Sequence, residues 1–226
     1  MNMDDLIDKL LESLWLQDRL SHNTLQSYRR DLVKVAVRLA EGGQDWLSAD
    51  EFALSDAVYA EGEKSTSQAR ALSACKRMYG WLEETGQRAD NPTRFLKAPK
   101  SERKLPTLIT EAQIDALLAA PDVETPHGLR DKALLEVMYA TGLRVTEAVK
   151  LTLSDIDLHR GSIRTIGKGD KLRLVPLGQE AAYWVERYCN ESRPLLLKNK
   201  LCDEVFVSQK RSGISRQLAW MIVKEY

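Results

Sequence analysis

Apolar residues recur every three to four positions through the first part of the chain, which is the spacing of amphipathic helices. One helix is predicted over residues 4–18, and a second begins after Ser21 or Asn23 and ends at Gly42-Gly43. The second has an apolar stripe, and its basic residues fall roughly opposite. The stripe consists of Leu25, Tyr28, Leu32, Val35 and Leu39, and the basic residues are Arg30, Lys34 and Arg38.

Two further helices complete the predicted amino-terminal part. Ser48-Ala49-Asp50-Glu51 has the pattern of a capping box that opens a helix ending near Ala60. A fourth helix begins near Ser65 or Thr66 and ends at Gly86; Leu72, Cys75, Tyr79 and Leu82 face inward, and Arg70 and Arg77 face away. Four helices with short connections predict a compact helical domain over residues 1–88.

Residues 89–107 show no sustained periodicity. They contain Pro92, Pro99 and Pro106 together with several basic residues. Charged segments punctuated by proline are typical of linkers, so a domain boundary is predicted here.

The pattern changes in residues 108–226. A capping box at Thr110 opens a helix that Pro121 stops, a helix over 129–141 is broken by Gly142, and a short helix follows through Lys150. Strands are predicted at 156–158, 162–166 and 172–177, with a turn at 167–170 between the last two. After the strands we expect a helix over 179–192, an extended piece at 204–208 and a last helix from Ser215. The predicted fold class is mostly α with a small antiparallel sheet, in which the second domain is mixed α+β.

Composition narrows the function. The chain has 33 basic and 33 acidic residues, so it does not coat nucleic acid through bulk charge, although a local basic groove stays possible. Its three cysteines, Cys75, Cys189 and Cys202, and its three histidines lack the spacing of a disulfide framework or a metal site, so neither is expected. No apolar run is long enough to cross a membrane, and the expected location is the cytosol.

Two cations stand at positions suited to phosphate chemistry. Arg144 follows the Gly142 break, and a guanidinium can donate two parallel hydrogen bonds to a phosphate. Lys168 lies between two glycines in the predicted turn, where an ammonium can protonate a leaving oxygen. The plainer alternatives are a surface ion pair between Arg144 and Glu147 and a solvated hairpin tip. Arg160, Arg164, Lys171 and Arg173 surround Lys168 in sequence, which favours phosphate binding.

Four separated motifs resemble one family. They are S-H-N-T-L-Q-S-Y-R-R-D-L, S-T-S-Q-A-R-A-L-S-A-C-K-R, A-T-G-L-R-V-T-E and I-R-T-I-G-K-G-D-K-L-R-L-V-P-L. In this order they resemble the bacterial tyrosine recombinases of the Xer type, and within that group the XerD-like subfamily. The resemblance covers essentially all 226 residues.

The resemblance implies a site-specific recombinase that cleaves and rejoins DNA through a 3′-phosphotyrosyl bond. Arg144 matches the family's first catalytic arginine, Lys168 its general-acid lysine and Glu147 its accessory acidic residue. The resemblance implies that the helical domain clamps the duplex, with phosphate contacts at Arg30, Lys34, Arg70 and Arg77. It implies that the second domain also contacts DNA, through Arg164, Lys171 and Arg173. No metal, nucleotide or other cofactor is implied, because the covalent intermediate stores the bond energy.

The family's downstream H-x-x-R segment and nucleophilic tyrosine do not occur in these 226 residues. No H-x-x-R segment lies between the predicted hairpin turn at 167–170 and Tyr226, so we do not expect Tyr226 to be the nucleophile. The chain is therefore expected to bind DNA without cleaving it.

The resemblance also implies a role in resolving chromosome dimers at a dif-like site during cell division. A XerC-like partner recombinase, a DNA translocase and self-association on DNA are implied with it. Two alternatives stay open: a noncatalytic DNA-binding protein derived from a recombinase, and a helical protein-interaction module. An in-frame H-x-x-R and tyrosine beyond the codon for Tyr226 would favour the enzyme over the first alternative.

Overall fold

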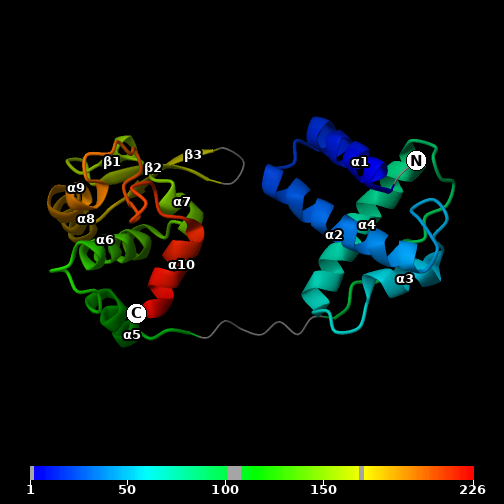
Figure 1. Ribbon diagram of the computed structural model, residues 1–226, viewed down its shortest axis with the longest axis horizontal. Helices are drawn as coiled ribbons and strands as arrows, with labels where there is room; N and C mark the ends of the chain where they lie inside the picture. Colours follow the sequence, from blue (N-terminus) through cyan, green and yellow to red (C-terminus); the bar gives the residue numbers. More distant parts are fainter. Residues whose placement is uncertain (1–2, 101–107, 168–170) are drawn as a thin grey trace. The chain divides into compact units, whose positions relative to one another are not determined.

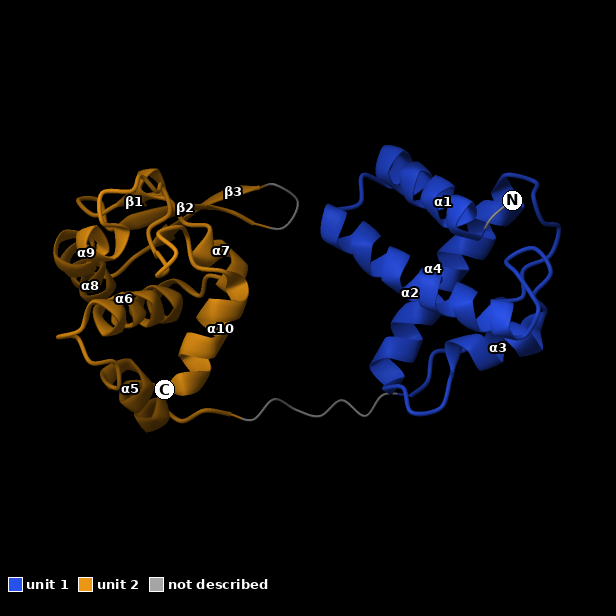
Figure 2. Cartoon of the chain, in the orientation of Figure 1, with its two compact units in different colours: residues 1–105 blue, residues 106–226 orange. Residues whose placement is uncertain are grey.

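The computed structural model describes residues 3–100, 108–167 and 171–226. The chain divides into two compact units, residues 1–105 and 106–226 (Figure 2). Each unit encloses an apolar cluster of its own.

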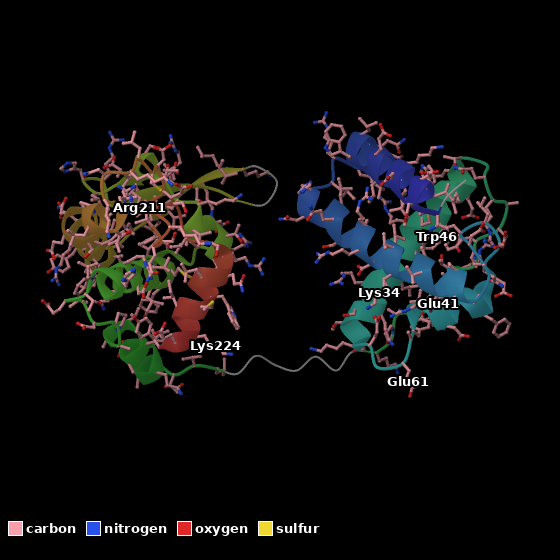
Figure 3. The ribbon with its side chains drawn as sticks, viewed as in Figure 1. Lys34, Glu41, Trp46, Glu61, Arg211 and Lys224 are labelled. Atoms are coloured by element: carbon pink, nitrogen blue, oxygen red, sulfur yellow. The ribbon has the colours of Figure 1, made fainter. Side chains whose placement is uncertain are left out.

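The described part of unit 1 contains four helices, which confirms the predicted number (Figure 1). They are α1 (Met3–Asp18), α2 (His22–Glu41), α3 (Glu51–Val58) and α4 (Ser65–Glu84). The stripe of α2 is buried at Leu32, Val35 and Leu39, and all four inward residues predicted on α4 are buried. Trp46, labelled in Figure 3, is fully buried and meets Tyr79 edge-on, with 5.9 Å between the ring centroids. The two predicted stripes thus form one core.

The start predicted for α3 is wrong by two residues. Ser48 does not cap the helix, because its backbone N–H and hydroxyl both donate to Oδ1 of Asp45, at 2.8 and 2.9 Å. The cap is Asp50, whose Oδ1 accepts from the amide of Ala53 at 2.8 Å. Both Asp and Ser can bond to nearby amides, and the turn at Asp45 takes up Ser48 first.

The described part of unit 2 is mainly helical around α6 (Pro126–Thr141), which packs against α5 (Glu111–Ala119) and α8 (Gln179–Arg187). The capping box at Thr110 is confirmed by reciprocal hydrogen bonds with Gln113 of 2.9 and 3.3 Å. The helix α6 begins three residues before the predicted Leu129, because Pro126 occupies its first turn, where a missing amide costs nothing. The helix α7 (Val145–Val149) follows the break at Gly142, and α10 (Arg216–Glu225) packs against α7.

The helix predicted to end at Ser192 continues further. After α8 the chain passes through a π-helical turn, η2 (Tyr188–Ser192), into α9 (Arg193–Leu197). Pro194 lies in the first turn of α9, where proline is tolerated. The π turn buries Tyr188, whose hydroxyl accepts from the amide of Val207 at 3.1 Å.

A three-stranded antiparallel sheet in the order β1-β2-β3 completes unit 2. Its strands are β1 (Ile156–Asp157), β2 (Ser162–Ile166) and β3 (Leu172–Pro176), each within one residue of its prediction. The predicted extended piece at 204–208 forms single bridges rather than a ladder, Thr152 with Glu204 and Val207 with Gly213. The fold class predicted from the sequence, mostly helical with a small antiparallel sheet, is confirmed.

Gly142 offers a test of the break between α6 and α7. It has φ +61°, and a Cβ added there would meet nothing within 4 Å. Gly142→Ala is therefore expected to destabilise unit 2 by about 1–2 kcal/mol through backbone strain alone. Gly80→Ala is the matched control, since Gly80 lies inside α4 with equally open space, and it should stabilise unit 1 by up to about 1 kcal/mol.

Hydrogen exchange read by mass spectrometry on peptides from each unit measures the two opening free energies separately. A neutral or stabilising Gly142→Ala would show that the left-handed turn is not required.

Candidate functional site

The end of α6 positions Arg144. The amide of Gly142 donates to the carbonyl of Met138 at 3.0 Å, and the left-handed turn at Gly142 redirects the chain. Leu143 is buried, and Arg144 is the N-cap residue immediately before α7. The predicted break thus fixes where the side chain of Arg144 starts.

The carboxylate of Glu147 is the centre of the site. Its Oε2 accepts from the backbone amide of Arg144 at 2.7 Å and from Nη2 of Arg173 at 2.9 Å, and its Oε1 accepts from Nη1 of Arg144 at 3.0 Å. The side chain of Glu147 is only 9% exposed. This is not the exposed surface ion pair considered as an alternative, because one largely buried carboxylate holds two arginines that lie 29 residues apart in the sequence.

The charge state of Glu147 follows from these contacts. Burial acts to raise its pKa, but the hydrogen bonds from the backbone and side chain of Arg144 and the charge of Arg173 outweigh burial. The net effect holds the pKa of Glu147 below its ordinary value. Glu147 is therefore ionised at neutral pH and keeps both guanidinium groups oriented.

The side chain of Arg144 is 65% exposed. Of its five N–H donors, one from Nη1 goes to Glu147, and the rest of the guanidinium has no hydrogen-bond partner in the described part of the chain. Its backbone amide already donates to Glu147, so this amide is not available to an anion from solution. What Arg144 offers to a phosphate is its guanidinium.

The β2–β3 hairpin carries Arg173 to Glu147. Arg173 pairs in register with Thr165, which is buried, so the two side chains lie on the same face of the sheet, although Arg173 is itself 42% exposed. Arg164 lies on the opposite face and donates to Asp155 at 3.3 and 3.4 Å. The basic stretch predicted as one group is thus divided between two faces, and among its described members only Arg173 is bonded to α7.

Lys171 precedes β3 and is exposed. Its carbonyl accepts from the amide of Gly167 at 2.9 Å, so the two strands are still paired at this point. Lys168 lies outside the described residues, and its approach to Arg144 stays a prediction.

Tyr226 follows the last residue of α10. Its hydroxyl donates to Oδ2 of Asp131 at 3.2 Å, and Asp131 is itself paired with Arg130 in the interior. Burial and the charge of Asp131 raise the pKa of Tyr226 to about 12. This end of α10 lies away from α7 (Figure 1). These contacts are unsuited to a nucleophile that must lose its proton.

In unit 1, three of the four predicted phosphate contacts are paired with acids. Arg70 makes a two-point contact with Asp31, at 2.6 and 2.8 Å, while Lys34 pairs with Glu63 and Arg77 with Asp18. Arg30 instead donates to the carbonyl of Gln26 and the hydroxyl of Ser27. The acidic partners come from other turns or other helices, which helical spacing along one element does not reveal.

Neither a metal site nor a membrane-spanning helix is found among the described residues. No group of three or more His, Cys, Asp or Glu side chains there could hold a metal ion. No helix there is long and apolar enough to cross a membrane. The three cysteines are free thiols.

Comparison with known proteins identifies the family. Residues 107–226 match the phage integrase family, and residues 7–86 match its N-terminal SAM-like domain. The chain belongs to the phage integrase family. Tyrosine recombinase XerD of Neisseria meningitidis serogroup B is 66% identical over 223 residues, which cover 99% of this chain and 77% of that protein. XerD of Yersinia pestis is 46% identical, with 98% and 75% covered. The predicted XerD-like tyrosine recombinase is confirmed.

Solved structures share the fold at lower identity. Lambda integrase (residues 75–356) bound to DNA has a TM-score of 0.74 at 16% identity, covering 100% of this chain and 77% of that one. The XerH recombinase in a post-cleavage complex with a palindromic difH substrate has a TM-score of 0.68 at 20% identity, covering 96% and 64%. These likenesses support the fold of this tyrosine recombinase.

The two faces of the hairpin allow a paired test of the Glu147 cluster. Arg173→Ala removes a positive charge from Glu147, so the pKa of Glu147 should rise while that of Asp155 stays unchanged. Arg164→Ala should raise the pKa of Asp155 and leave that of Glu147 unchanged, because Arg164 helps to lower the pKa of Asp155. Carboxyl carbon NMR titration of both residues measures the two effects. Equal movement of both carboxylates in either variant would contradict the separation of the faces.

Proposed function

We propose that this chain carries the DNA-binding part and two catalytic residues of a site-specific recombinase that acts through a 3′-phosphotyrosyl intermediate. The observation that supports it most is the Glu147 cluster, in which a buried carboxylate presents the exposed guanidinium of Arg144. A guanidinium fixed on one side and free on the other can stabilise the charge that grows on a phosphate during transfer.

In the proposed reaction a tyrosine oxygen forms a bond to phosphorus as the bond to the 5′-oxygen breaks. Arg144 binds the nonbridging oxygens, and Lys168 gives its proton to the departing 5′-oxygen. Glu147 positions Arg144 and does not touch the substrate. The free 5′-hydroxyl then attacks the phosphotyrosine of a partner strand, which restores the backbone without an external energy source.

The biological setting of the proposal follows the XerD relatives. We propose that the substrate is a dif-like site and that the reaction resolves chromosome dimers during cell division. A XerC-like recombinase and a DNA translocase are the proposed partners, and the tetramer that lambda integrase forms on a Holliday junction supports self-association on DNA. Residues 1–226 on their own are proposed to bind such a site without cleaving it, since no H-x-x-R segment followed by a tyrosine occurs after the β2–β3 hairpin.

Arg30 is the residue best suited to testing DNA contact by unit 1. It donates to the carbonyl of Gln26 and the hydroxyl of Ser27, so its replacement leaves no buried acid unpaired. Arg30→Gln should weaken binding to duplexes of any sequence and reduce the slope of log K against log salt by about 0.9, the value of one phosphate contact. Arg94→Gln is the control, an exposed arginine beyond α4 that should leave the slope unchanged.

Fluorescence anisotropy with labelled duplex across a salt series gives both slopes. Binding that does not depend on salt would instead favour a protein-interaction module.

The catalytic roles can be tested in a chimera in which the C-terminal quarter of the N. meningitidis relative follows residue 226. Arg144→Ala should slow strand cleavage by about 10²–10³, the cost of one anion-stabilising donor. Lys168→Ala should slow cleavage while duplex binding stays nearly intact. Covalent complexes with a dif-like duplex, resolved on denaturing gels, measure cleavage.

A suicide substrate with a sulfur leaving atom at the 5′ position separates the two roles, because a thiolate departs without a proton donor. It should restore the rate of Lys168→Ala and leave Arg144→Ala slow. Restoration of both variants, or of neither, would overturn the assignment.

A further inference from the structure

The solvent side of α2 places two valines among cations. Val33 is 37% exposed and Val37 is 54% exposed. Arg30 and Lys34 each precede one of these valines by three residues, so cation and valine alternate along one face over about 10 Å. This face lies opposite the buried stripe of the same helix.

Neither valine contributes to the core of unit 1. The apolar cluster of this unit, in the described residues, is made by other side chains, and the valines are not among those packed against it. A β-branched residue in the middle of a helix is also less favourable than alanine by about half a kcal/mol. Stability of the fold therefore gives no reason for valine at either position.

Charge distinguishes this face from two other exposed apolar residues of unit 1. Trp15 on α1 is 59% exposed but lies one turn from Asp18, and Phe52 on α3 is 83% exposed but lies one turn from Asp56. Acids beside an apolar group disfavour a polyanion. On α2 the neighbours are cations, so the surface is complementary to nucleic acid. Lys34 and Glu41, labelled in Figure 3, lie on this helix, and Glu41, one turn after Val37, sets the limit of the basic face.

We propose that Val33 and Val37 contact thymine methyl groups in the major groove and so determine part of the site preference. The proposal rests on the proposed function, since it requires that unit 1 binds duplex DNA. The major groove admits an α-helix, and thymine presents a methyl group there that apolar side chains recognise. Arg30 and Lys34 hold the helix by the flanking phosphates, which carry no sequence information.

The ion pairs of α2 are compatible with this role. Glu63 accepts from both Lys34 and Arg38, so it retains a partner when Lys34 turns toward a phosphate. The face from Arg30 to Val37 spans about three base-pair steps at 3.4 Å each. The thymine preference is therefore confined to two or three adjacent positions.

The experiment uses the whole 226-residue chain and a randomised duplex library. The chain selects its preferred duplexes, and the best one is resynthesised with deoxyuridine in place of each thymine in turn, which removes only the methyl group. At two or three adjacent positions this change should weaken binding of the unaltered chain about fourfold, the worth of one buried methyl group. The double variant Val33→Ala, Val37→Ala should lose this sensitivity and bind both duplexes within twofold.

Phe52→Ala is the matched control, since it removes an exposed apolar side chain from the acid-flanked surface; it should keep the full deoxyuridine effect. Circular dichroism checks that the double variant remains folded, and alanine should raise its helix stability.

The inference is overturned if the unaltered chain does not distinguish deoxyuridine from thymidine, or if the double variant retains the fourfold effect. Steeply salt-dependent binding to the same duplexes would leave the proposed function intact in either case. A chain that binds no duplex would overturn both.

Discussion

The site in unit 2 depends on one buried carboxylate. Glu147 joins α7 to the β2–β3 hairpin, because the same side chain accepts from Arg144 at the start of the helix and from Arg173 in the strand. Each arginine alone is a flexible, half-exposed side chain. Their common partner, Glu147, has a side chain that is only 9% exposed, so packing fixes its position. Its hydrogen bonds then orient both guanidinium groups. The exposed donors of Arg144 are thereby oriented before any substrate arrives.

Much of the fold could be predicted from the sequence because its signals are local. The capping box at Thr110, the glycine at the end of α6 and the alternation in β2 each act over a few residues. Errors arose where two local signals competed. Ser48 is predicted to cap α3, but it bonds to Asp45 in the preceding turn, and Asp50 caps the helix instead.

The candidate site was predictable only in part. Arg144 and Glu147 stand three residues apart, so their pairing was considered from the sequence, but its burial was not. Glu147 and Arg173 are 26 residues apart, and no local pattern links them. The opposite faces of Arg164 and Arg173 depend on the register across the hairpin, which sets Arg164 against Leu174 and Thr165 against Arg173. The placement of Lys168 remains a prediction.

The ion pairs of unit 1 affect how strongly salt weakens binding to nucleic acid. A guanidinium that leaves Asp31 or Asp18 for a phosphate exchanges one anion for another and exposes a carboxylate that attracts a cation from solution. Ions released from the nucleic acid are then partly taken up by the protein. The number of counterions released on association would therefore be smaller than the number of arginines and lysines that touch the backbone, and counting charges on this surface would overestimate how far salt weakens the complex.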